Sequence, residues 1–497
     1  MAHRRIYALD YGRGLAIFGM LLAHTFEGGI CNWVHPVELD YLNRIPKWVI
    51  VCLSPIALLC MMGLFFTFIT TMACTMSIVN IEKHGRGAVV SYLFYRLVFG
   101  VVLKTVELVL KTWWEEFGVF DKMKIEVPVT ELTTFSHTLD SIAFCGFLVP
   151  LTVHVFRILP YFRENWKRQV AGMTTLATIL LMSYSYIAIF TCWIGDWALK
   201  YHFNLLMTVM YKIGTGSFMI SQAFPFGIIG GCISLIMLNQ SSWKTLWTYT
   251  GIVAGIAVVT AVYFLIVTPD PFKEVLNERK PCFLRFLELG VETFITTWLS
   301  SYSDNPDYPV IKRYRYNRAT TFLRRLGCVS LTCFIFEEWV SKELRKVFFI
   351  FFGEPYDLES AKSLWNFWVV GLFMIVNFVI DLLLVRAWGK ANFVFSCERL
   401  IGAIMSWLFG RTEKVDWKAN NDKIIYGPLR ANEEEIMTKG TEKDREELKK
   451  IVGDKRFEKL VAEHVEAGVV ETPIPHGDQN TQEIEMTPVT ETKLDSA

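Results

Sequence analysis

The stretch that decides the fold reads Leu9-Asp10-Tyr11-Gly12-Arg13-Gly14-Leu15-Ala16-Ile17-Phe18-Gly19-Met20-Leu21-Leu22-Ala23-His24. Read as a helix, it places Asp10, Arg13 and His24 on one face, because the spacings between them fit whole turns. Arg13 and His24 are about three turns, or roughly 16 Å, apart. The other residues are apolar enough to enter a bilayer, where ionisable groups are costly. We therefore expect these three side chains to face a site inside a helical bundle.

The composition predicts the class of the protein. The chain has 497 residues, of which 52% are hydrophobic and 14% aromatic. Long segments carry no Asp, Glu, Lys or Arg, and they lie between Lys47 and Glu82, Arg168 and Asp196, Lys212 and Lys244, and Lys244 and Asp270. Each is longer than the about 20 residues that a spanning helix needs. We expect an all-α, polytopic integral membrane protein.

The hydrophobic pattern predicts about ten transmembrane helices. They are expected at about 9–30, 47–76, 89–110, 138–159, 169–194, 213–238, 245–267, 320–340, 363–387 and 392–410. The amphipathic segment Cys282–Tyr302 could lie in the interface or re-enter the membrane. The basic cluster at 312–325 should be cytosolic, yet seven preceding spans place it on the far side. The sequence leaves this conflict open.

Charge divides the chain into a membrane domain, 1–410, and an acidic tail, 411–497, with 20 acidic and 14 basic residues. In the tail, Thr441–Gly468 is expected to form a short amphipathic helix, and the residues from 471 onward are expected to be disordered. Arg4 and Arg5 place the N-terminus in the cytosol, and the tail is expected there too. A concentrated basic face is missing, which argues against nucleic-acid binding.

Other residue types point to no metal or disulfide chemistry. The eleven cysteines include no CxxC pair, so we expect buried thiols rather than disulfides or zinc ligands. The histidines His84, His137, His154 and His202 have no metal-ligand spacing, so no metal is expected.

Glu337 and Glu338 are adjacent, and we expect a span to end near them with both carboxylates in solvent.

The pattern Leu9-Asp10-x-x-Arg13-Gly14-x-Ala16-x-x-x-Met20-x-x-x-His24 resembles the opening of the transmembrane acyltransferases. This superfamily includes the heparan-alpha-glucosaminide N-acetyltransferases and the YeiB-like membrane proteins. In the former, the active histidine matches His35, eleven residues beyond His24. Arg96 is similar to the family's arginine early in the third span. Glu398 is similar to a glutamate near the C-terminal end, although the family's Gly-Pro before it is absent.

The resemblance implies an acyl-CoA-dependent acyltransferase. Such an enzyme transfers an acyl group, usually acetyl, from cytosolic acetyl-CoA to an acceptor on the far side of the membrane, expected here to be a saccharide. It implies that His35 acts as base or transient acyl carrier and that His24 assists. Asp10 and Arg13 would bind and align CoA, with Arg96 as further support. The membrane would be the plasma membrane or that of a lysosome-like organelle, and a homo-oligomer is compatible with the sequence.

Each of these residues also has a simpler interpretation. Asp10 and Arg13 could form an ion pair that orients the helix start, and His24 could bond to a neighbouring helix. Without the resemblance, His35 is a loop histidine before Pro36, and Arg96 could extend to the membrane interface. Two other functions therefore stay open. One is a proton-coupled transporter with Asp10, Arg13 and His24 as a relay, and the other is an inactive scaffold that acts through its tail.

Overall fold

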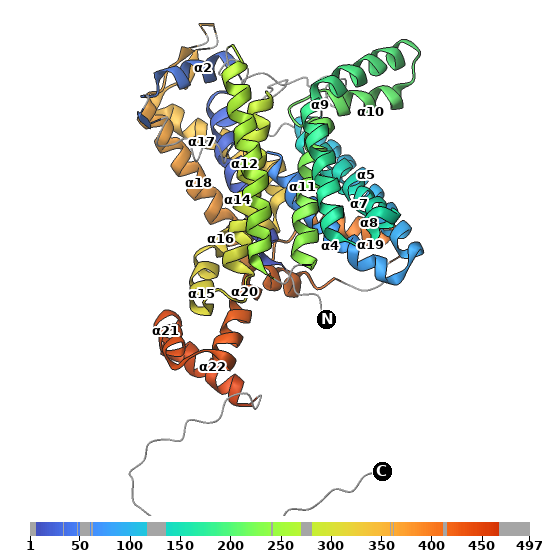
Figure 1. The fold of residues 1–497 in the computed structure, drawn as a ribbon. Helices are drawn as coiled ribbons and strands as arrows, with labels where there is room; N and C mark the ends of the chain where they lie inside the picture. Colours follow the sequence, from blue (N-terminus) through green and yellow to red (C-terminus); the bar gives the residue numbers. More distant parts are fainter. Residues whose placement is uncertain are drawn as a thin grey trace, which may run out of the picture. The chain divides into compact units, whose positions relative to one another are not determined.

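The computed structural model describes residues 6–32, 34–46, 48–49, 60, 63–116, 136–239, 242–269, 281–357, 359–360, 362–410 and 415–466. The chain is divided into two compact units, Met1–Ala431 and Asn432–Ala497. The described parts of both units are mainly helical (Figure 1).

The described residues in the first half of the larger unit are mainly helical. The helices are α1 (Tyr7–His24), its π-helical continuation η1 (Thr25–Ile30), α2 (His35–Arg44), α4 (Phe65–Ile81), the 3-10 turn η2 (Glu82–His84), α5 (Arg86–Glu116), α7 (Thr138–Ile158), α8 (Pro160–Arg163), α9 (Trp166–Lys200), α10 (Asn204–Gly214), α11 (Ile220–Asn239) and α12 (Trp243–Val267).

The second half adds helices and one small hairpin. They are α14 (Cys282–Ser303), α15 (Val310–Ala319), α16 (Thr321–Cys328), α17 (Ser330–Phe352), α18 (Phe367–Lys390), α19 (Cys397–Leu408) and α20 (Trp417–Lys439), which crosses into the second unit. Strands β1 (Tyr356–Asp357) and β2 (Lys362–Ser363) pair antiparallel, with Tyr356 opposite Ser363. The described cysteines are free thiols.

Six helical segments of the described chain are long and apolar enough to cross a membrane. They are Phe65–His84, Thr138–Ile158, Trp166–Lys200, Ile220–Asn239, Trp243–Val267 and Phe367–Lys390. Their burial differs sharply: 89% of the apolar window is buried in α11, against 22% in α12. Helix α11 packs against α4, α7 and α9, whereas α12 keeps large apolar side chains such as Val259 and Ile266 exposed. Helix α11 is therefore a core helix, and α12 presents an apolar outer face.

Two of the expected spans differ from the structure. The segment 392–410 contains only the 12-residue α19, which rises about 18 Å and cannot cross a hydrocarbon core of about 30 Å alone. The segment 320–340 is broken at Val329, where α16 ends and α17 begins. Much of the expected span 47–76 lies outside the described residues.

The start of α1 and the end of α14 meet at one end of the bundle. The Asp304 carboxylate accepts hydrogen bonds from the backbone N–H groups of Tyr7 and Ala8, both at 2.9 Å. A carboxylate in this place satisfies free N–H groups and interacts favourably with the helix dipole. Since α15 and α16 follow directly, the basic cluster at 312–325 belongs to the same end as the start of α1.

The second unit has more helix than expected. The single amphipathic helix expected over Thr441–Gly468 is two helices, α21 (Glu442–Val452) and α22 (Asp454–Glu466). Gly453 separates them with φ of 85°, a conformation that glycine adopts without steric cost. Thr441 and Asp444 form a reciprocal capping box at the start of α21. The expected disordered segment from 471 onward lies outside the described residues.

Candidate functional site

The glycines of the first motif allow α1 and α16 to approach closely. A Cβ atom at Gly14 would overlap the carbonyl oxygen of Leu323. On the facing helix, a Cβ atom at Gly327 would lie 2.7 Å from the carbonyl oxygen of Asp10. Small residues at facing positions let two helix backbones touch, so these two glycines fix α1 against α16.

Next to this contact, Arg324 of α16 binds α1 through a buried guanidinium. Its Nη1 donates to the hydroxyl of Tyr11, and its Nη2 donates to the carbonyl of Asn317 at 2.8 Å. Its Nε donates to the carbonyl of Ile425 at 2.7 Å. Asp10 is buried in the same region, with 5% of its surface exposed. Asp10 is thus part of the α1–α16 contact, and its predicted role toward CoA stays a prediction.

Arg13 lies one turn further along α1 and is only half-buried. Among the described residues, its guanidinium has no ion-pair or hydrogen-bond partner. A partly buried arginine without a protein carboxylate retains all five N–H donors for another anion. The described contacts therefore include no pair between Arg13 and Asp10, and the predicted ligand role of Arg13 stays a prediction.

His24 ends α1 and contacts a buried acid of α17. Its Nδ1 bonds to the carboxylate of Glu337, which is 9% exposed. The expectation that Glu337 lies in solvent at the end of a span is wrong, because α17 continues to Phe352 and presents Glu337 to α1. Glu338, one residue on and about 100° round the helix, is more exposed and pairs with Lys342 at 2.7 Å.

A second acid extends this group onto α18. The side-chain amide of Asn377 donates to the hydroxyl of Thr25 at 2.9 Å and to the carboxylate of Asp381 at 3.0 Å. Asp381 also interacts electrostatically with Glu337. We call His24, Glu337 and Asp381 the acidic cluster, since Glu337 interacts with both the imidazole and the second acid. Asp381 was missed from sequence, although a lone acid inside the apolar run 367–385 signals a buried functional group.

Three further residues were singled out from the sequence, and none is shown to contact the acidic cluster in the described part of the chain. His35 is the first residue of α2, and its side chain is outside the description, so its catalytic role stays a prediction. Arg96 donates through Nε to the carbonyl of Gly146 at 3.1 Å and lies 4.9 Å over the ring of Phe99. These contacts tie Arg96 to α5 and α7, whereas Arg13 packs beside α16. Glu398 accepts from the backbone N–H of Leu331 at 2.7 Å and thereby holds the start of α17.

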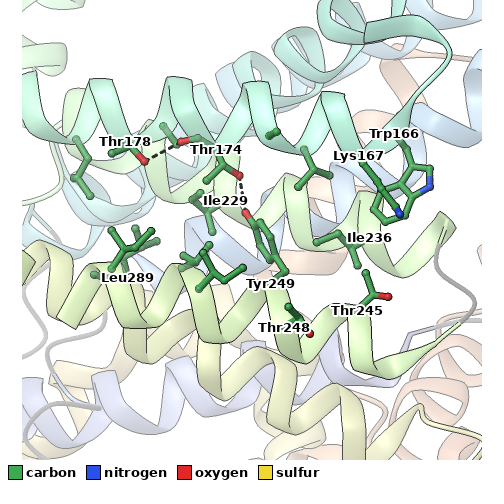
Figure 2. A pocket seen from close by; sticks show the side chains of 18 of the residues that line it. Trp166, Lys167, Thr174, Thr178, Ile229, Ile236, Thr245, Thr248, Tyr249 and Leu289 are labelled. Atoms are coloured by element: carbon green, nitrogen blue, oxygen red, sulfur yellow. Dashed lines mark hydrogen bonds between the residues drawn. The ribbon is translucent and has the colours of Figure 1, made fainter. Parts of the chain in front are cut away.

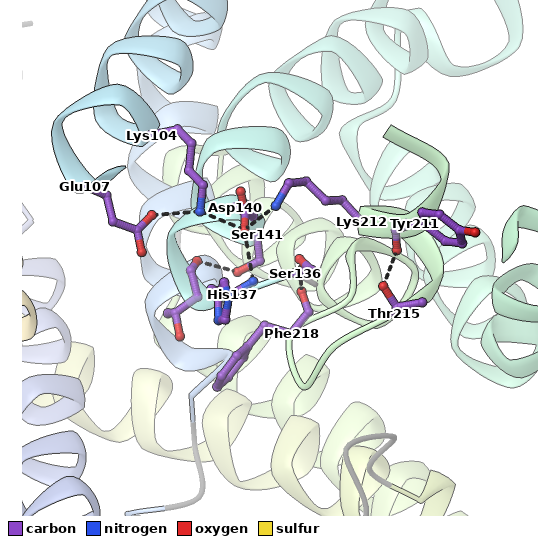
Figure 3. A network of polar contacts seen from close by, with 11 residues as sticks. Lys104, Glu107, Ser136, His137, Asp140, Ser141, Tyr211, Lys212, Thr215 and Phe218 are labelled. Carbon is purple, nitrogen blue, oxygen red and sulfur yellow. Dashed lines mark hydrogen bonds and ion pairs between the residues drawn. The ribbon is translucent and has the colours of Figure 1, made fainter. Parts of the chain in front are cut away.

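A separate set of buried charges joins α5, α7 and α10 (Figure 3). The Asp140 carboxylate accepts from Lys104 at 3.1 Å and from Lys212 at 2.9 Å, and Lys104 also donates to Glu107 at 2.9 Å. We call these four residues the balanced cluster, because two lysines face two carboxylates. Each of its ammonium groups has a carboxylate partner, which is the arrangement expected of a structural ion-pair network.

A hollow in the larger unit is lined by none of the residues predicted to be functional (Figure 2). It has a volume of about 530 Å³ and is lined by apolar side chains of α9, α11, α12 and α14, with Thr174 and Tyr249 bonded across it at 2.9 Å.

Within the described part of the chain, no group of three His, Cys, Asp or Glu side chains could hold a metal ion.

Comparison with known proteins assigns neither a family nor a function to this chain. Neither a scan against protein-family models nor a search of curated proteins finds a match for this chain. The candidate site therefore depends on the residues and their geometry alone.

Proposed function

We propose that this protein is a membrane acyltransferase that moves an acyl group, usually acetyl, from cytosolic acyl-CoA to a saccharide on the far side. One observation carries the proposal. Helix α1 holds an arginine, Arg13, that has no ion-pair or hydrogen-bond partner among the described residues. About three turns away it holds an imidazole bonded to a buried carboxylate. The first suits a phosphate group, and the second is the arrangement of an oriented general base.

The chemistry follows from these two sites. Arg13 holds a phosphate of CoA near the start of α1, and the pantetheine arm extends toward His24. The His24 imidazole accepts the proton of the acceptor hydroxyl or amine while its oxygen or nitrogen attacks the thioester carbonyl. The C–S bond breaks, and the leaving CoA thiolate takes up a proton. Glu337 fixes the imidazole and stabilises its protonated form.

The helix arrangement supports a consistent topology for this reaction. We propose ten spans, in which α14 replaces the expected span at 392–410. Helix α14 has 22 residues and rises about 33 Å, enough for a core of about 30 Å. With α14 crossing, the basic loops at 83–86, 157–168 and 312–325 all lie on the cytosolic side, as the positive-inside rule requires. Arg13 is then close to the cytosol, and His24 is near the far side.

The remaining predicted roles belong to the same proposal. His35 follows on the far side, where we expect it to take the proton on from His24 or to carry the acyl group transiently, and Asp10 helps to align CoA. The two contacts of Arg96 make it a weaker CoA ligand than Arg13. The protein would reside in the plasma membrane or in a lysosome-like membrane, with its tail in the cytosol.

The direct test is acyl transfer by the purified, full-length protein. Acetyl-CoA with a labelled acetyl group is offered with saccharides that carry a free amine or hydroxyl, and products are analysed by mass spectrometry. We expect a labelled saccharide with wild type and with His84→Ala, whose histidine is exposed at η2. His24→Ala should yield none. Equal product from His24→Ala, or no product and no release of CoA thiol from wild type, would reject the proposal.

A further inference from the structure

Helix α14 carries a stripe of polar side chains through the interior of the larger unit. Arg285, Glu288, Glu292, Thr296 and Ser300 are separated by three or four residues, so they share one face of the helix. All five are buried, with at most 2% of their surface exposed. We call them the α14 stripe. Buried polar groups along several successive turns of one helix are costly in a membrane protein and usually line a functional path.

One end of this stripe is bonded to other protein groups. Arg285 donates to Glu288 at 2.6 Å, to the amide oxygen of Gln222 at 3.0 Å and to the carbonyl of Ser217 at 2.6 Å. Just beyond the other end of the stripe, the hydroxyl of Ser303 donates to Asp304 at 2.7 Å. Asp304 in turn holds the first N–H groups of α1.

The rest of the stripe, from Glu292 to Ser300, has no such partners among the described residues. Neither carboxyl oxygen of Glu292 has a hydrogen-bond partner in the part of the chain that the structure describes, and the same holds for the hydroxyls of Thr296 and Ser300. Glu292 itself has no exposed surface. Buried polar atoms in folded proteins nearly always have a partner, often an ordered water. Three such groups at successive turns therefore indicate a line of bound water along α14.

Glu292 is enclosed in the bundle, and its carboxyl oxygens have no partner among the described residues. The other charged side chains of α14, Arg285 and Glu288, are bonded to each other. Among the helices packed against α14, α11 has no charged side chain, α12 has only Lys244, and α1 has Asp10, Arg13 and His24. Helix α15, which follows the far end of α14 from Arg285, has Lys312, Arg313, Arg315 and Arg318. A buried carboxylate without a counter-ion costs many kcal/mol, so the neutral acid is the favoured form.

We propose that the α14 stripe is a hydrated proton path across the bundle, in which Glu292 accepts a proton on one side and releases it on the other. The step forms and breaks only O–H bonds: a hydronium gives its proton to the carboxylate of Glu292, and the acid later gives it to water near Thr296 and Ser300. This activity does not depend on acyl transfer, because none of the stripe residues contributes to the His24 site.

Proton flux into vesicles tests the proposal. The full-length protein is reconstituted with a pH-sensitive dye inside, and a potassium gradient with valinomycin sets the potential. We expect wild-type vesicles to acidify faster than protein-free vesicles, and Glu292→Gln vesicles to fall to the protein-free rate. The matched control is Glu343→Gln, since Glu343 is partly exposed and pairs with Lys346 at 2.9 Å on α17. It should retain the wild-type rate.

A second measurement guards against a folding defect in the variant. Infrared spectra of wild type should contain the C=O band of a protonated carboxylic acid, and this band should shift promptly in D2O because water reaches Glu292. Ser300→Ala should slow both the shift and the flux. The proposal is overturned if wild type conducts no faster than protein-free vesicles, if Glu292→Gln conducts like wild type, or if the band resists exchange in D2O.

Discussion

The balanced cluster and the acidic cluster are both buried, yet they differ in how their charges are matched. In the balanced cluster, Lys104 and Lys212 share Asp140, and Glu107 completes a neutral set of four. In the acidic cluster, the His24 imidazole bonds to Glu337, and Glu337 also interacts with a second acid, Asp381. Matched buried charges hold helices together, whereas crowded carboxyls around a histidine favour exchange of protons. On this contrast we propose that the balanced cluster supports the fold and that the acidic cluster takes part in the proposed acyl transfer.

The largest expected effect on stability comes from the balanced cluster. Asp140→Ala leaves two ammonium groups facing each other without their shared carboxylate, and breaking such a buried pair costs about 3–5 kcal/mol. Thermal unfolding in detergent should show a large fall in Tm. Glu164→Ala, which removes an exposed acid next to α8, should change Tm little. Equal Tm values for the two variants would show that the balanced cluster does not stabilise the fold.

A substitution in the acidic cluster should reduce activity strongly and change stability little. Glu337→Gln retains the size of the side chain but removes the charge that supports a protonated His24. We expect release of CoA thiol from acetyl-CoA to fall about 10²- to 10⁴-fold, with a smaller change in Tm than Asp140→Ala causes. Glu338→Gln, at the neighbouring acid, is the matched control and should retain activity. The assignment fails if both glutamine variants turn over equally.

The position of α1 should depend on one glycine. Gly14→Ala would place a Cβ atom against the carbonyl of Leu323, which belongs to the backbone and cannot move aside easily. We expect a loss of about 1–3 kcal/mol in stability, as for other overpacked sites. Gly251→Ala on α12 meets open space and should be neutral or stabilising by up to about 1 kcal/mol. Similar unfolding curves for both variants would contradict the close α1–α16 contact.

The smallest expected effect is a pH dependence of the hydrogen bonds at Asp40, which lies outside both clusters. Its carboxylate accepts hydrogen bonds from the hydroxyl of Ser363 at 2.6 Å and from its backbone N–H at 2.7 Å, and these bonds lower the pKa of Asp40. A lowered pKa in the folded state means that the contact stabilises above the ordinary value of about 4 and weakens as pH falls below it. Hydrogen exchange at the Ser363 amide should therefore gain protection between acid and neutral pH in wild type. Asp40→Asn should remove that dependence.

Sequence could predict the long apolar helices and the polar face of α1, because charge-free length and helical spacing are local properties. It could not predict that Glu337 reaches His24, because the pair is separated by more than 300 residues along the chain and depends on how α17 packs. The amphipathic segment at 282–302 was ambiguous for a related reason. Its buried face carries Arg285 and Glu292, so its mean hydropathy resembles that of an interfacial helix.

The ends of short helices were also difficult to predict from the sequence. An apolar stretch of 19 residues at 392–410 resembles a span, yet positive φ angles at Asn392, Phe393 and Phe395 and the cap at Ser396 leave only α19 helical. The split at Val329 follows from contacts made by Gly327 and Glu398, which are distant from each other in sequence. Their roles depend on α1 and α17, so no local pattern reveals them.

The central claim is that α1 separates donor binding, at Arg13, from proton handling, at His24. Calorimetry of acetyl-CoA binding to the purified protein, with acyl transfer measured on the same samples, tests it most directly. We expect Arg13→Ala to weaken binding by about 10- to 100-fold, as for a lost charged hydrogen bond. His24→Ala should bind acetyl-CoA like wild type without transferring the acyl group. Unchanged binding by Arg13→Ala, or no binding by well-folded wild type, would contradict the claim.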